Sequence, residues 1–481
     1  MTKNKFYVTT AIPYVNAAPH IGFALEIVQT DVLARYHRPV GDDTYFLTGT
    51  DENALKNVQA AEKAGVPVKE FVDRNSQRFE DLKGALNLSF DDFIRTTEDR
   101  HIRGAQKLWQ ACDPDDIYKK NYRGLYCVGC EQFYTEKELI DGKCPEHDTA
   151  PETVEEENYF FRLSKYQKQL EELIESDELK IVPLSRKNEV LSFIKQGLED
   201  FSISRSVKRA KGWGIPVPGD DTQIIYVWFD ALTNYITGLG YANDGEKFKK
   251  YWLENPHRTH VIGKGILRFH AVYWPAMLLS AKLPPPTEIF VHGYLTVEGQ
   301  KISKSLGNVV DPFALAKKYG ADPVRYYLLA KFSPFEDGDF SERKLKETYN
   351  ADLANGLGNL VSRVAKLAEG IETKYEVKSL KENGLYHKAL EKFRFDEAIG
   401  LVWSEIAELN RYINDQKPWE KEGPNLDKDL QHLTSNILHL TSLIEPFLPE
   451  TSQKIKDQFS GKIAAAKPLF PRLRDASFQE G

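Results

Sequence analysis

The chain has 481 residues, which is too long for a single hydrophobic core and favours about three domains. Its composition, 41% hydrophobic and 12% aromatic, is typical of a globular protein and excludes a largely disordered chain. The net charge of −7 does not by itself indicate a nucleic-acid partner, although basic side chains gathered on one face could still bind RNA. No apolar stretch is long enough to cross a bilayer and no signal peptide precedes the first strand pattern, so we expect a cytoplasmic protein without a membrane partner.

An alternation of strand and helix patterns opens the chain. Residues 6–12 are rich in β-branched and aromatic side chains and predict a strand. Apolar residues then recur at helical spacing from Ile21, and 44–47 predicts a second strand. The segment 51–64 predicts a helix that Gly65 closes. This order is typical of an α/β fold with a parallel, Rossmann-type sheet.

The alternation breaks near residue 117. A turn-rich block with three of the four cysteines occupies about 117–148, and predicted helices follow it. Strand patterns return at 223–228, 260–263 and 288–292, with a helical stretch at 266–281. We therefore expect one parallel-sheet fold that is split by an insertion.

Helical patterns dominate the C-terminal part. Three long amphipathic stretches, 345–369, 386–416 and 430–459, predict an all-α bundle, and no strand pattern is expected after about residue 342. The predicted segments are 1–116 and 212–297 for the two halves of the Rossmann-type fold, 117–211 for the insertion, 298–341 for a connecting region and 342–481 for the bundle.

Two short motifs suit phosphate chemistry. Pro19-His20-Ile21-Gly22 lies where a strand gives way to a helix, so that helix N–H groups, a glycine and an imidazole donor can approach a triphosphate. Lys301-Ile302-Ser303-Lys304-Ser305 places two lysines and two hydroxyls in a glycine-flanked loop that could neutralise a departing pyrophosphate. Taken singly, the two motifs also fit a capped core histidine and a solvated basic loop.

Together and in this order, the two motifs resemble the HIGH and KMSKS signatures of class I aminoacyl-tRNA synthetases. Four further segments resemble the methionyl-tRNA synthetase family, and matching segments extend over nearly the whole chain. These segments are TAIPYVN at 10–16, FLTGTDE at 46–52, YVWFDA at 226–231 and FHAVYWP at 269–275. The resemblance implies a Rossmann-type catalytic domain, a zinc-binding insertion, a KMSKS-loop and stem-contact region and an all-α anticodon-binding bundle.

The resemblance also implies a reaction and its sites. ATP-dependent activation of L-methionine would precede transfer to tRNA(Met), including the initiator tRNA, and Mg²⁺ would accompany the ATP. The ATP-binding residues would be His20, Gly22, Gly263, Gly293, Lys301, Ser303 and Lys304. Four of them would act in catalysis, namely His20, Gly22, Lys301 and Lys304.

The amino-acid site implied by the resemblance is an aromatic pocket beside a carboxylate. The pocket would comprise Ala11, Ile12, Tyr14, Trp228, Ala231, Tyr235, Ile266, His270 and Trp274. Aromatic edges and faces suit a polarizable thioether, and Asp51 would hold the substrate ammonium. Ordinary core packing is the alternative interpretation of the two tryptophans, and a helix N-cap is the alternative for Asp51.

The resemblance places anticodon recognition in the bundle. Asn359 and Arg363 are four residues apart on one predicted helix face, and Trp419 follows Pro418. An aromatic plane with an amide and a guanidinium suits splayed single-stranded bases. Without the resemblance, Trp419 would more simply be a hydrophobic plug at a helix end.

The remaining cysteines have the spacing of a structural zinc knuckle. Cys127-x2-Cys130 and Cys144-x2-His147 are two short chelating turns separated by a hairpin-length connection. Four ligands fill a tetrahedron, so we expect one structural Zn²⁺ per chain. A redox pair is the competing interpretation of Cys127 and Cys130, but redox work does not require the second pair of ligands.

Three positions depart from the family pattern. Phe23 replaces a second histidine, Gly265 replaces an aspartate, and Ile302 replaces a methionine of similar volume. The first two motivate an alternative function, a tRNA-binding paralogue that has lost activation. A second alternative is a synthetase for another apolar amino acid, although the insertion is too short for the usual editing domain. We expect a monomer, because the appended module that dimerises some relatives has no counterpart here.

Overall fold

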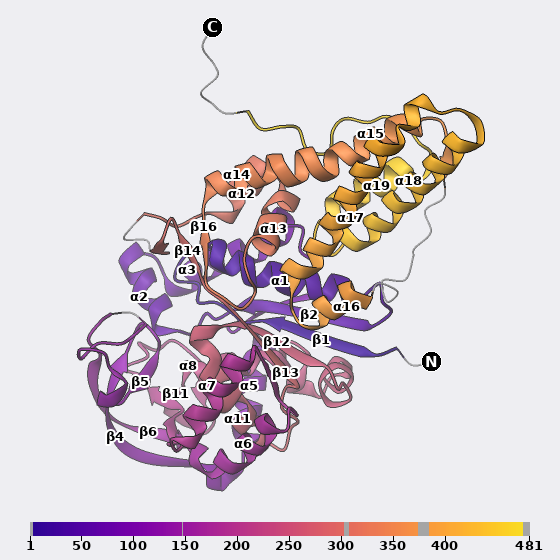
Figure 1. Ribbon diagram of the computed structural model, residues 1–481. Helices are drawn as coiled ribbons and strands as arrows, with labels where there is room; N and C mark the ends of the chain where they lie inside the picture. Colours follow the sequence, from indigo (N-terminus) through magenta and orange to yellow (C-terminus); the bar gives the residue numbers. More distant parts are fainter. Residues whose placement is uncertain (1–2, 147, 303–306, 374–383, 475–481) are drawn as a thin grey trace. The chain divides into compact units, whose positions relative to one another are not determined.

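The computed structural model describes residues 3–146, 148–302, 307–373 and 384–474. The chain forms two compact units (Figure 1). The first comprises Met1–Pro19, Asp42–Asp81 and Phe90–His292, and the second comprises His20–Gly41, Leu82–Ser89 and Gly293–Gly481. Among the helices of the described residues, none combines the length and apolar character that a membrane crossing requires.

A six-stranded parallel sheet organises the first unit. Its strand order is β3 (Asp92–Arg95), β2 (Asp43–Thr50), β1 (Lys5–Thr10), β12 (Arg258–Gly263), β13 (Glu288–His292) and β7 (Lys180–Val182). The pairings β1–β2, β1–β12 and β12–β13 are all parallel (Figure 1). The carboxyl ends of the strands therefore meet at one edge, where parallel α/β folds bind their ligands. The predicted Rossmann-type sheet is confirmed.

The central strands are buried on both faces. Every residue of β12 is buried, and β1 is buried after its first residue. Both strands therefore show continuous burial rather than an alternation of buried and exposed residues, and their polar members, such as Thr9 and His260, are buried as well. The helices that follow the strands include α2 (Leu55–Ala64), α3 (Val68–Glu80), α5 (Asp99–Ala111) and α11 (Trp274–Ser280).

The inserted part of the first unit is largely antiparallel. One sheet has the order β5 (Gln132–Tyr134), β4 (Ile117–Cys127), β6 (Glu152–Phe161) and β8 (Phe201–Ser202). A second has the order β10 (Pro216–Val217), β11 (Asp220–Ile225) and β9 (Ser204–Ser206). Helices α6 (Gln167–Glu175) and α7 (Leu184–Lys195) flank β7 in the chain.

Several predicted elements need correction. The strand predicted at 223–228 is β11, which pairs antiparallel with β9 instead of joining the parallel sheet, and Trp228 lies in α8 (Val227–Leu232). Strand β7 was not predicted, because three residues between helical patterns give little periodic signal. The helical stretch 266–281 divides into a 3₁₀ turn, a π-helical segment and α11.

The helix predicted at 51–64 begins only at Leu55. Its N-cap position is Ala54, so the interpretation of Asp51 as an N-cap is wrong. The physical reason is a tertiary contact: Asp51 donates its backbone N–H to the Pro13 carbonyl at 2.9 Å and forms a parallel bridge with Tyr14. That bridge keeps residue 51 extended. Gly65 ends the helix in the left-handed conformation, as predicted.

The second unit is mainly helical. It contains α1 (Ile21–His37), α4 (Leu82–Ala85), α12 (Pro312–Tyr319), α13 (Ala321–Ala330), α14 (Glu342–Thr348), a π-helical segment (Tyr349–Gly358), α15 (Asn359–Leu367), α16 (Gly384–Glu391), α17 (Phe395–Gln416), α18 (Gly423–Ile444) and α19 (Pro449–Phe459). A small sheet has the order β15 (Gln300–Lys301), β14 (Leu295–Val297) and β16 (Gly338–Phe340). Two short strands, Glu372–Thr373 and Gly461–Lys462, pair within the bundle and correct the expectation that none follows residue 342.

A fully buried arginine joins three parts of the second unit. Arg325 of α13 forms an ion pair with Asp31 of α1 at 2.8 Å. Its guanidinium also donates to the carbonyls of Leu86, Pro446 and Phe447. Because all five N–H donors of a buried guanidinium need acceptors, these contacts fix the two helices and the neighbouring loops together.

Arg325→Met should destabilise the second unit by about 3–5 kcal/mol, because it leaves the Asp31 carboxylate buried with less countercharge. Urea unfolding followed by far-UV circular dichroism measures the loss. Arg343→Met is the matched control, since Arg343 is exposed and pairs only with Glu347 one helical turn away. The control should cost less than ~1 kcal/mol. Equal losses in the two variants would contradict the assignment.

Candidate active site

The turn after β2 places a carboxylate at the edge of the parallel sheet. Asp51 is only 2% exposed. Its backbone carbonyl accepts from the Asn57 side chain at 3.0 Å, and one side-chain oxygen accepts from the Asn53 N–H at 3.1 Å. No other hydrogen bond or ion pair reaches the Asp51 carboxylate from the described part of the chain. A buried carboxylate in this state is suited to a cation supplied by a ligand.

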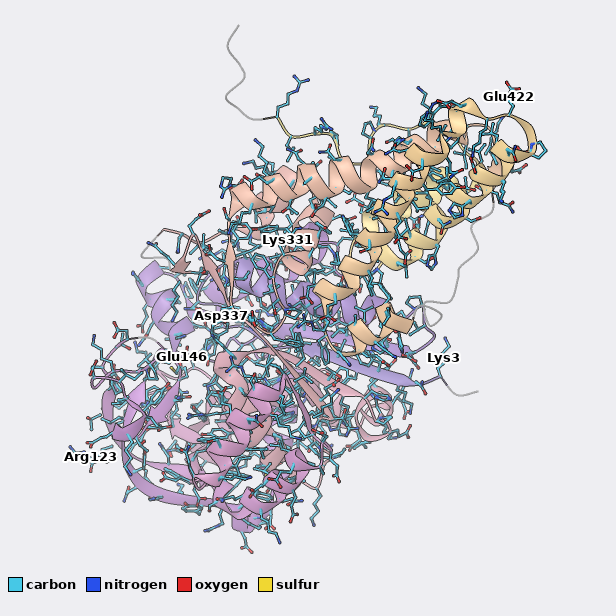
Figure 2. The ribbon with its side chains drawn as sticks, viewed as in Figure 1. Lys3, Arg123, Glu146, Lys331, Asp337 and Glu422 are labelled. Atoms are coloured by element: carbon cyan, nitrogen blue, oxygen red, sulfur yellow. The ribbon has the colours of Figure 1, made fainter. Side chains whose placement is uncertain are left out.

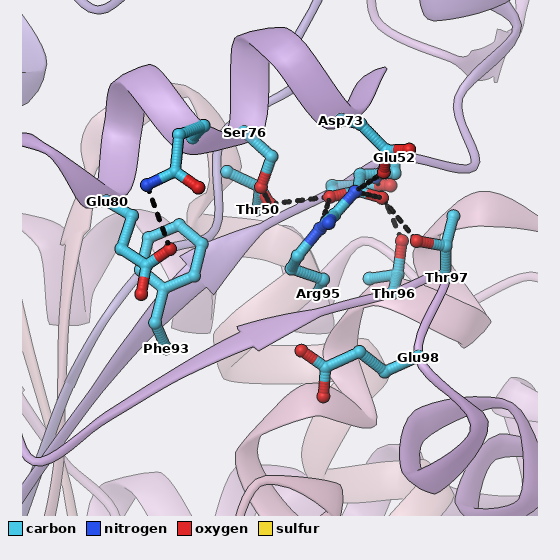
Figure 3. Close-up of polar contacts among 12 residues, drawn as sticks. Thr50, Glu52, Asp73, Ser76, Glu80, Phe93, Arg95, Thr96, Thr97 and Glu98 are labelled. Atoms are coloured by element: carbon cyan, nitrogen blue, oxygen red, sulfur yellow. Dashed lines mark hydrogen bonds and ion pairs between the residues drawn. The ribbon is translucent and has the colours of Figure 1, made fainter. Parts of the chain in front are cut away.

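The neighbouring residue Glu52 anchors this turn on one side (Figure 3). Its fully buried carboxylate accepts two hydrogen bonds from Arg95, at 2.6 and 3.0 Å, and a further one from Thr97. The Arg95 guanidinium also contacts Asp73. The Glu52 carbonyl accepts from the Trp213 indole at 2.8 Å. A bidentate arginine–carboxylate pair of this kind fixes geometry as well as charge.

A second buried carboxylate lies on the other side of the turn. The Asn53 side chain donates to Asp230 Oδ2 at 2.8 Å, and His101 Nε2 contacts Asp230 Oδ1 at 2.6 Å. His101 Nδ1 in turn lies 2.8 Å from Thr237 Oγ1. His101, Asp230 and Thr237 are all fully buried. The sequence analysis did not single out Asn53, His101 or Asp230.

The electrostatic surroundings of Asp51 are unfavourable for its negative charge. Burial raises the pKa of Asp51 well above its ordinary value, and the nearby charge of Asp230 raises it further. Glu131 and Glu52 act in the same direction. A bound ammonium would relieve this penalty, because an opposite charge favours the ionised carboxylate.

Aromatic side chains follow in the same unit. Trp228 stacks on Phe269 with ring centroids 3.7 Å apart, and Tyr14 meets Trp228 edge-on at 6.4 Å. The Trp228 indole donates to the Cys130 carbonyl at 3.2 Å. Ala11, Ile12 and Ile266 are partly buried against the same core as Trp228, and Ala231 is buried in α8. The predicted amino-acid-site residues named here all lie within the first unit.

Burial sets the protonation of His270, and hydrogen bonds set its tautomer. Burial lowers the pKa of His270 to about 4, so its imidazole is neutral near pH 7. Nδ1 lies 2.9 Å from the Ile266 carbonyl and must donate, so Nε2 accepts the 2.7 Å hydrogen bond from the Tyr235 hydroxyl. Among the described residues, three buried polar atoms nearby have no hydrogen-bond partner, and these are Tyr14 Oη, His260 Nε2 and Trp274 Nε1.

The cysteine cluster lies at the β4–β5 turn. The sulfurs of Cys127, Cys130 and Cys144 all lie within 4.8 Å of one another, which is a spacing that a metal ion could bridge. The Tyr134 hydroxyl contacts the sulfurs of Cys130 and Cys144 at 3.1 and 3.5 Å. The fourth predicted ligand, His147, lies outside the described residues. Three convergent thiols fit a soft metal such as zinc.

The two phosphate motifs belong to the second unit. His20 caps α1, because its Nδ1 accepts a hydrogen bond from the Gly22 N–H at 3.0 Å. In the neutral ring the proton therefore lies on Nε2, which can act as a donor. Burial lowers the pKa of His20, which favours this neutral form. A Cβ on Gly22 would lie 2.9 Å from the His20 ring and 3.9 Å from Ile302, so the two motifs meet at this glycine. Ser303 and Lys304 lie outside the described residues.

Further predicted site residues take definite places. Lys301 lies in β15 and pairs with Thr296 of β14, and Gly263 ends β12 in the first unit. Gly293 has no room for a side chain, because its Cβ would lie 1.9 Å from the Glu336 carbonyl. Gly265 lies in the 3₁₀ turn Lys264–Ile266.

The predicted anticodon residues all lie in the helical unit. Asn359 is exposed at the start of α15, and Arg363 on the same helix donates to Asn414 at 2.7 Å. Trp419 is 55% exposed in the loop between α17 and α18, where Glu422 is labelled in Figure 2. This exposure rules out the hydrophobic-plug interpretation of Trp419.

Asp51→Asn should raise the thermal stability of the ligand-free protein. Because the pKa of Asp51 is raised in the folded protein, the unfolded chain loses the Asp51 proton at a lower pH than the folded protein does. Asp51 therefore lowers the free energy of unfolding progressively above about pH 4. The free energy of unfolding gained by Asp51→Asn should therefore grow with pH and level off above the folded-state pKa of Asp51. The total gain should be about 1.4 kcal/mol for each unit by which that pKa is raised. Calorimetry between about pH 5 and pH 8 tests this.

Asp31→Asn is the control for that experiment. Burial opposes the ionisation of Asp31, but the charges of Arg325 and Arg35 hold its pKa below the ordinary value. The same substitution there should lower stability at neutral pH, because a favourable charge pair is lost. Destabilisation by Asp51→Asn across the whole range would show that its carboxylate is already neutralised within the protein.

Comparisons with known proteins identify the family. A model of the family "tRNA synthetases class I (M)" matches residues 6–150 and 147–365. The chain is 42% identical to the methionine–tRNA ligase of Brucella suis biovar 1 over all of both chains. It is 42% identical to that of Thermotoga maritima over 94% of this chain and 74% of the relative.

Two solved structures point to the same family. Mycobacterium tuberculosis methionyl-tRNA synthetase in complex with methionyl-adenylate matches with a TM-score of 0.88 at 39% identity, covering 98% of this chain and all of the other. The apo form of that enzyme matches with a TM-score of 0.82 at 36% identity, covering 98% of this chain and 99% of the other. The chain therefore belongs to the methionine–tRNA ligase family of class I tRNA synthetases.

Proposed function

We propose that the protein activates L-methionine with ATP and transfers it to tRNA(Met), including the initiator tRNA. The observation that carries the proposal is a buried carboxylate, Asp51, in the same unit as the aromatic side chains around Trp228 and His270. A carboxylate suits the amino group of the substrate, and polarizable rings suit a thioether. Since tRNA charging serves translation, the cytoplasm is the expected compartment, and we propose that the enzyme acts as a monomer.

In the first step, the methionine carboxylate attacks the α-phosphorus of ATP. A phosphorus–oxygen bond forms to the carboxylate, the bond to the β-phosphate bridge breaks, and pyrophosphate leaves with the electron pair. No protein nucleophile is required, so catalysis rests on position and charge. In the proposal, the Nε2–H of His20 and the backbone at Gly22 meet phosphate oxygens, and Lys301 with Lys304 neutralises the leaving pyrophosphate. Mg²⁺ is expected on the ATP phosphates, and we assign it no protein ligand.

Three glycine and serine positions complete the proposed ATP site. Gly263 and Gly293 are proposed to let backbone approach the nucleotide, and Ser303 is proposed to donate to its phosphates. In the second step, a terminal ribose hydroxyl of the tRNA attacks the methionyl carbonyl carbon and releases its proton. The bond from that carbon to the bridging oxygen breaks, and AMP leaves with this oxygen and the electron pair. Asn359, Arg363 and Trp419 are proposed to read the anticodon bases.

We further propose that the cysteine cluster with His147 binds one structural Zn²⁺. When bound, the ion would order the turns of the insertion and supply no chemistry to the reaction. The three sulfurs already converge, and Cys130 carries the carbonyl that receives the Trp228 indole. The residues therefore fit the ion.

Pyrophosphate exchange tests the function. The protein, ATP and labelled pyrophosphate should exchange label into ATP faster with methionine than with leucine, isoleucine, valine or cysteine at equal concentration. Faster exchange with another amino acid would overturn the substrate assignment. Absence of exchange together with retained tRNA(Met) binding would support the alternative, a paralogue that has lost activation.

Freshly purified protein should contain one zinc per chain by elemental analysis. Cys144→Ala should lower that content and increase proteolysis of residues 117–148, because the loss of a ligand loosens both turns. Cys112→Ala is the control, since this buried cysteine lies outside the cluster. Wild-type protein without zinc would contradict the metal assignment.

Trp419→Ala should weaken aminoacylation of tRNA(Met) while pyrophosphate exchange changes little. Loss of one base stack costs ~1–3 kcal/mol, which corresponds to roughly a tenfold rise in KM for the tRNA. Trp403→Ala is a control within the same helical elements, because the Trp403 ring packs on Tyr326 instead of facing solvent. Equal losses in both assays for Trp419→Ala would indicate a structural role.

A further inference from the structure

The turn that carries Asp51 links two buried carboxylates. The Asn53 backbone N–H donates to Asp51, and the Asn53 side chain donates to Asp230. Asp230 also receives the 2.6 Å contact from His101, so both of its oxygens are engaged.

The other acids around Asp51 have strong partners. Glu52 is paired with Arg95, and Glu131 is paired with Arg205 at 3.0 Å. Within the described residues, Asp230 contacts the neutral Asn53 amide and the imidazole of His101, and no arginine or lysine pairs with it. It therefore lacks the guanidinium partner that Glu52 and Glu131 have, and burial keeps water from screening its charge.

Resting on the proposed function, we propose that Asp230 is a positioning residue for the substrate ammonium. It fixes the Asp51 carboxylate through Asn53 and adds a second negative charge that favours a cation at Asp51. His101 and Thr237 hold Asp230 in place from the opposite side. Asp51 touches the ammonium, whereas Asp230 acts through Asp51 and through the field of the pocket.

Two ligands separate this role from ordinary structural support. Methionine carries the ammonium, while its deaminated analogue, methylthiobutanoate, keeps the side chain and carboxylate but lacks that charge. Damage to the pocket shape would weaken both ligands alike. Loss of the field from Asp230 would weaken methionine alone, so the ratio of the two affinities reports the interaction.

The experiment is titration calorimetry of the full chain with each ligand. Wild type should prefer methionine, and Asp230→Asn should reduce the preference about tenfold, as expected when a charge-assisted interaction is lost. Asn53→Ala should reduce it in the same direction, and it keeps the test available if Asp230→Asn does not fold. Asp116→Asn is the matched control: Asp116 is equally buried in the same unit and contacts Tyr166, Lys165 and Ser280.

The outcomes are distinct. A reduced preference in the Asp230 and Asn53 variants with an unchanged ratio in Asp116→Asn supports the proposal. An unchanged ratio in Asp230→Asn, or in Asn53→Ala where the first variant does not fold, overturns it. Wild type that binds neither ligand and exchanges no pyrophosphate would refute the proposed function as well as this inference.

Discussion

A buried carboxylate, Asp51, that forms no ion pair within the described residues is the constraint around which the first unit is arranged. Asp51 could be neutralised by a neighbouring arginine, as Glu52 and Glu131 are. Instead, Arg95 and Arg205 pair with these two neighbours, and the Asp51 carboxylate keeps a single hydrogen bond within the described residues. A ligand that supplies an ammonium, as proposed for methionine, would remove this electrostatic penalty.

The insertion is connected to the pocket through one short stretch of backbone. The Cys130 carbonyl accepts from Trp228, and the next residue, Glu131, accepts from the Lys56 backbone N–H at 3.2 Å and pairs with Arg205. The turn that bears the cysteines thus contacts both the helix after Asp51 and the aromatic wall. Direct hydrogen bonds therefore connect the cysteine-bearing turn to Trp228 and to α2.

Local sequence patterns predicted the elements whose residues show a clear propensity or periodicity. The strands at 6–12 and 288–292, the helix from Ile21 and the stop at Gly65 were found where propensity and periodicity indicated them. The errors arise where a partner distant in sequence decides the conformation. Asp51 is extended because it pairs with Tyr14, and 223–228 joins an antiparallel sheet because β9 is its neighbour.

The candidate amino-acid site shows that long-range contacts limit the prediction of function in the same way. Trp228, His270 and Tyr235 could be singled out because they lie in segments that resemble a family, and Asp51 for the same reason. His101 and Asp230 could not, because a lone histidine in a helix and an acid after two aromatics have many ordinary explanations. Their meaning comes from a 2.6 Å contact between residues on α5 and α8. Asp230 lies in a segment that resembles the family, but the resemblance did not indicate a role for this residue.

The phosphate motifs illustrate what a structure adds to a motif that was recognised correctly. The sequence supports a glycine at position 22 on the ground that backbone must approach a phosphate. In the structure, the same glycine also admits the His20 ring, which turns back to cap its own helix, and it lies beside Ile302 of the second motif. The cap uses Nδ1 and thereby leaves the proton on Nε2. One small residue thus determines which nitrogen of the histidine can donate, and a larger side chain there would alter the chemistry of His20 before it obstructed any ligand.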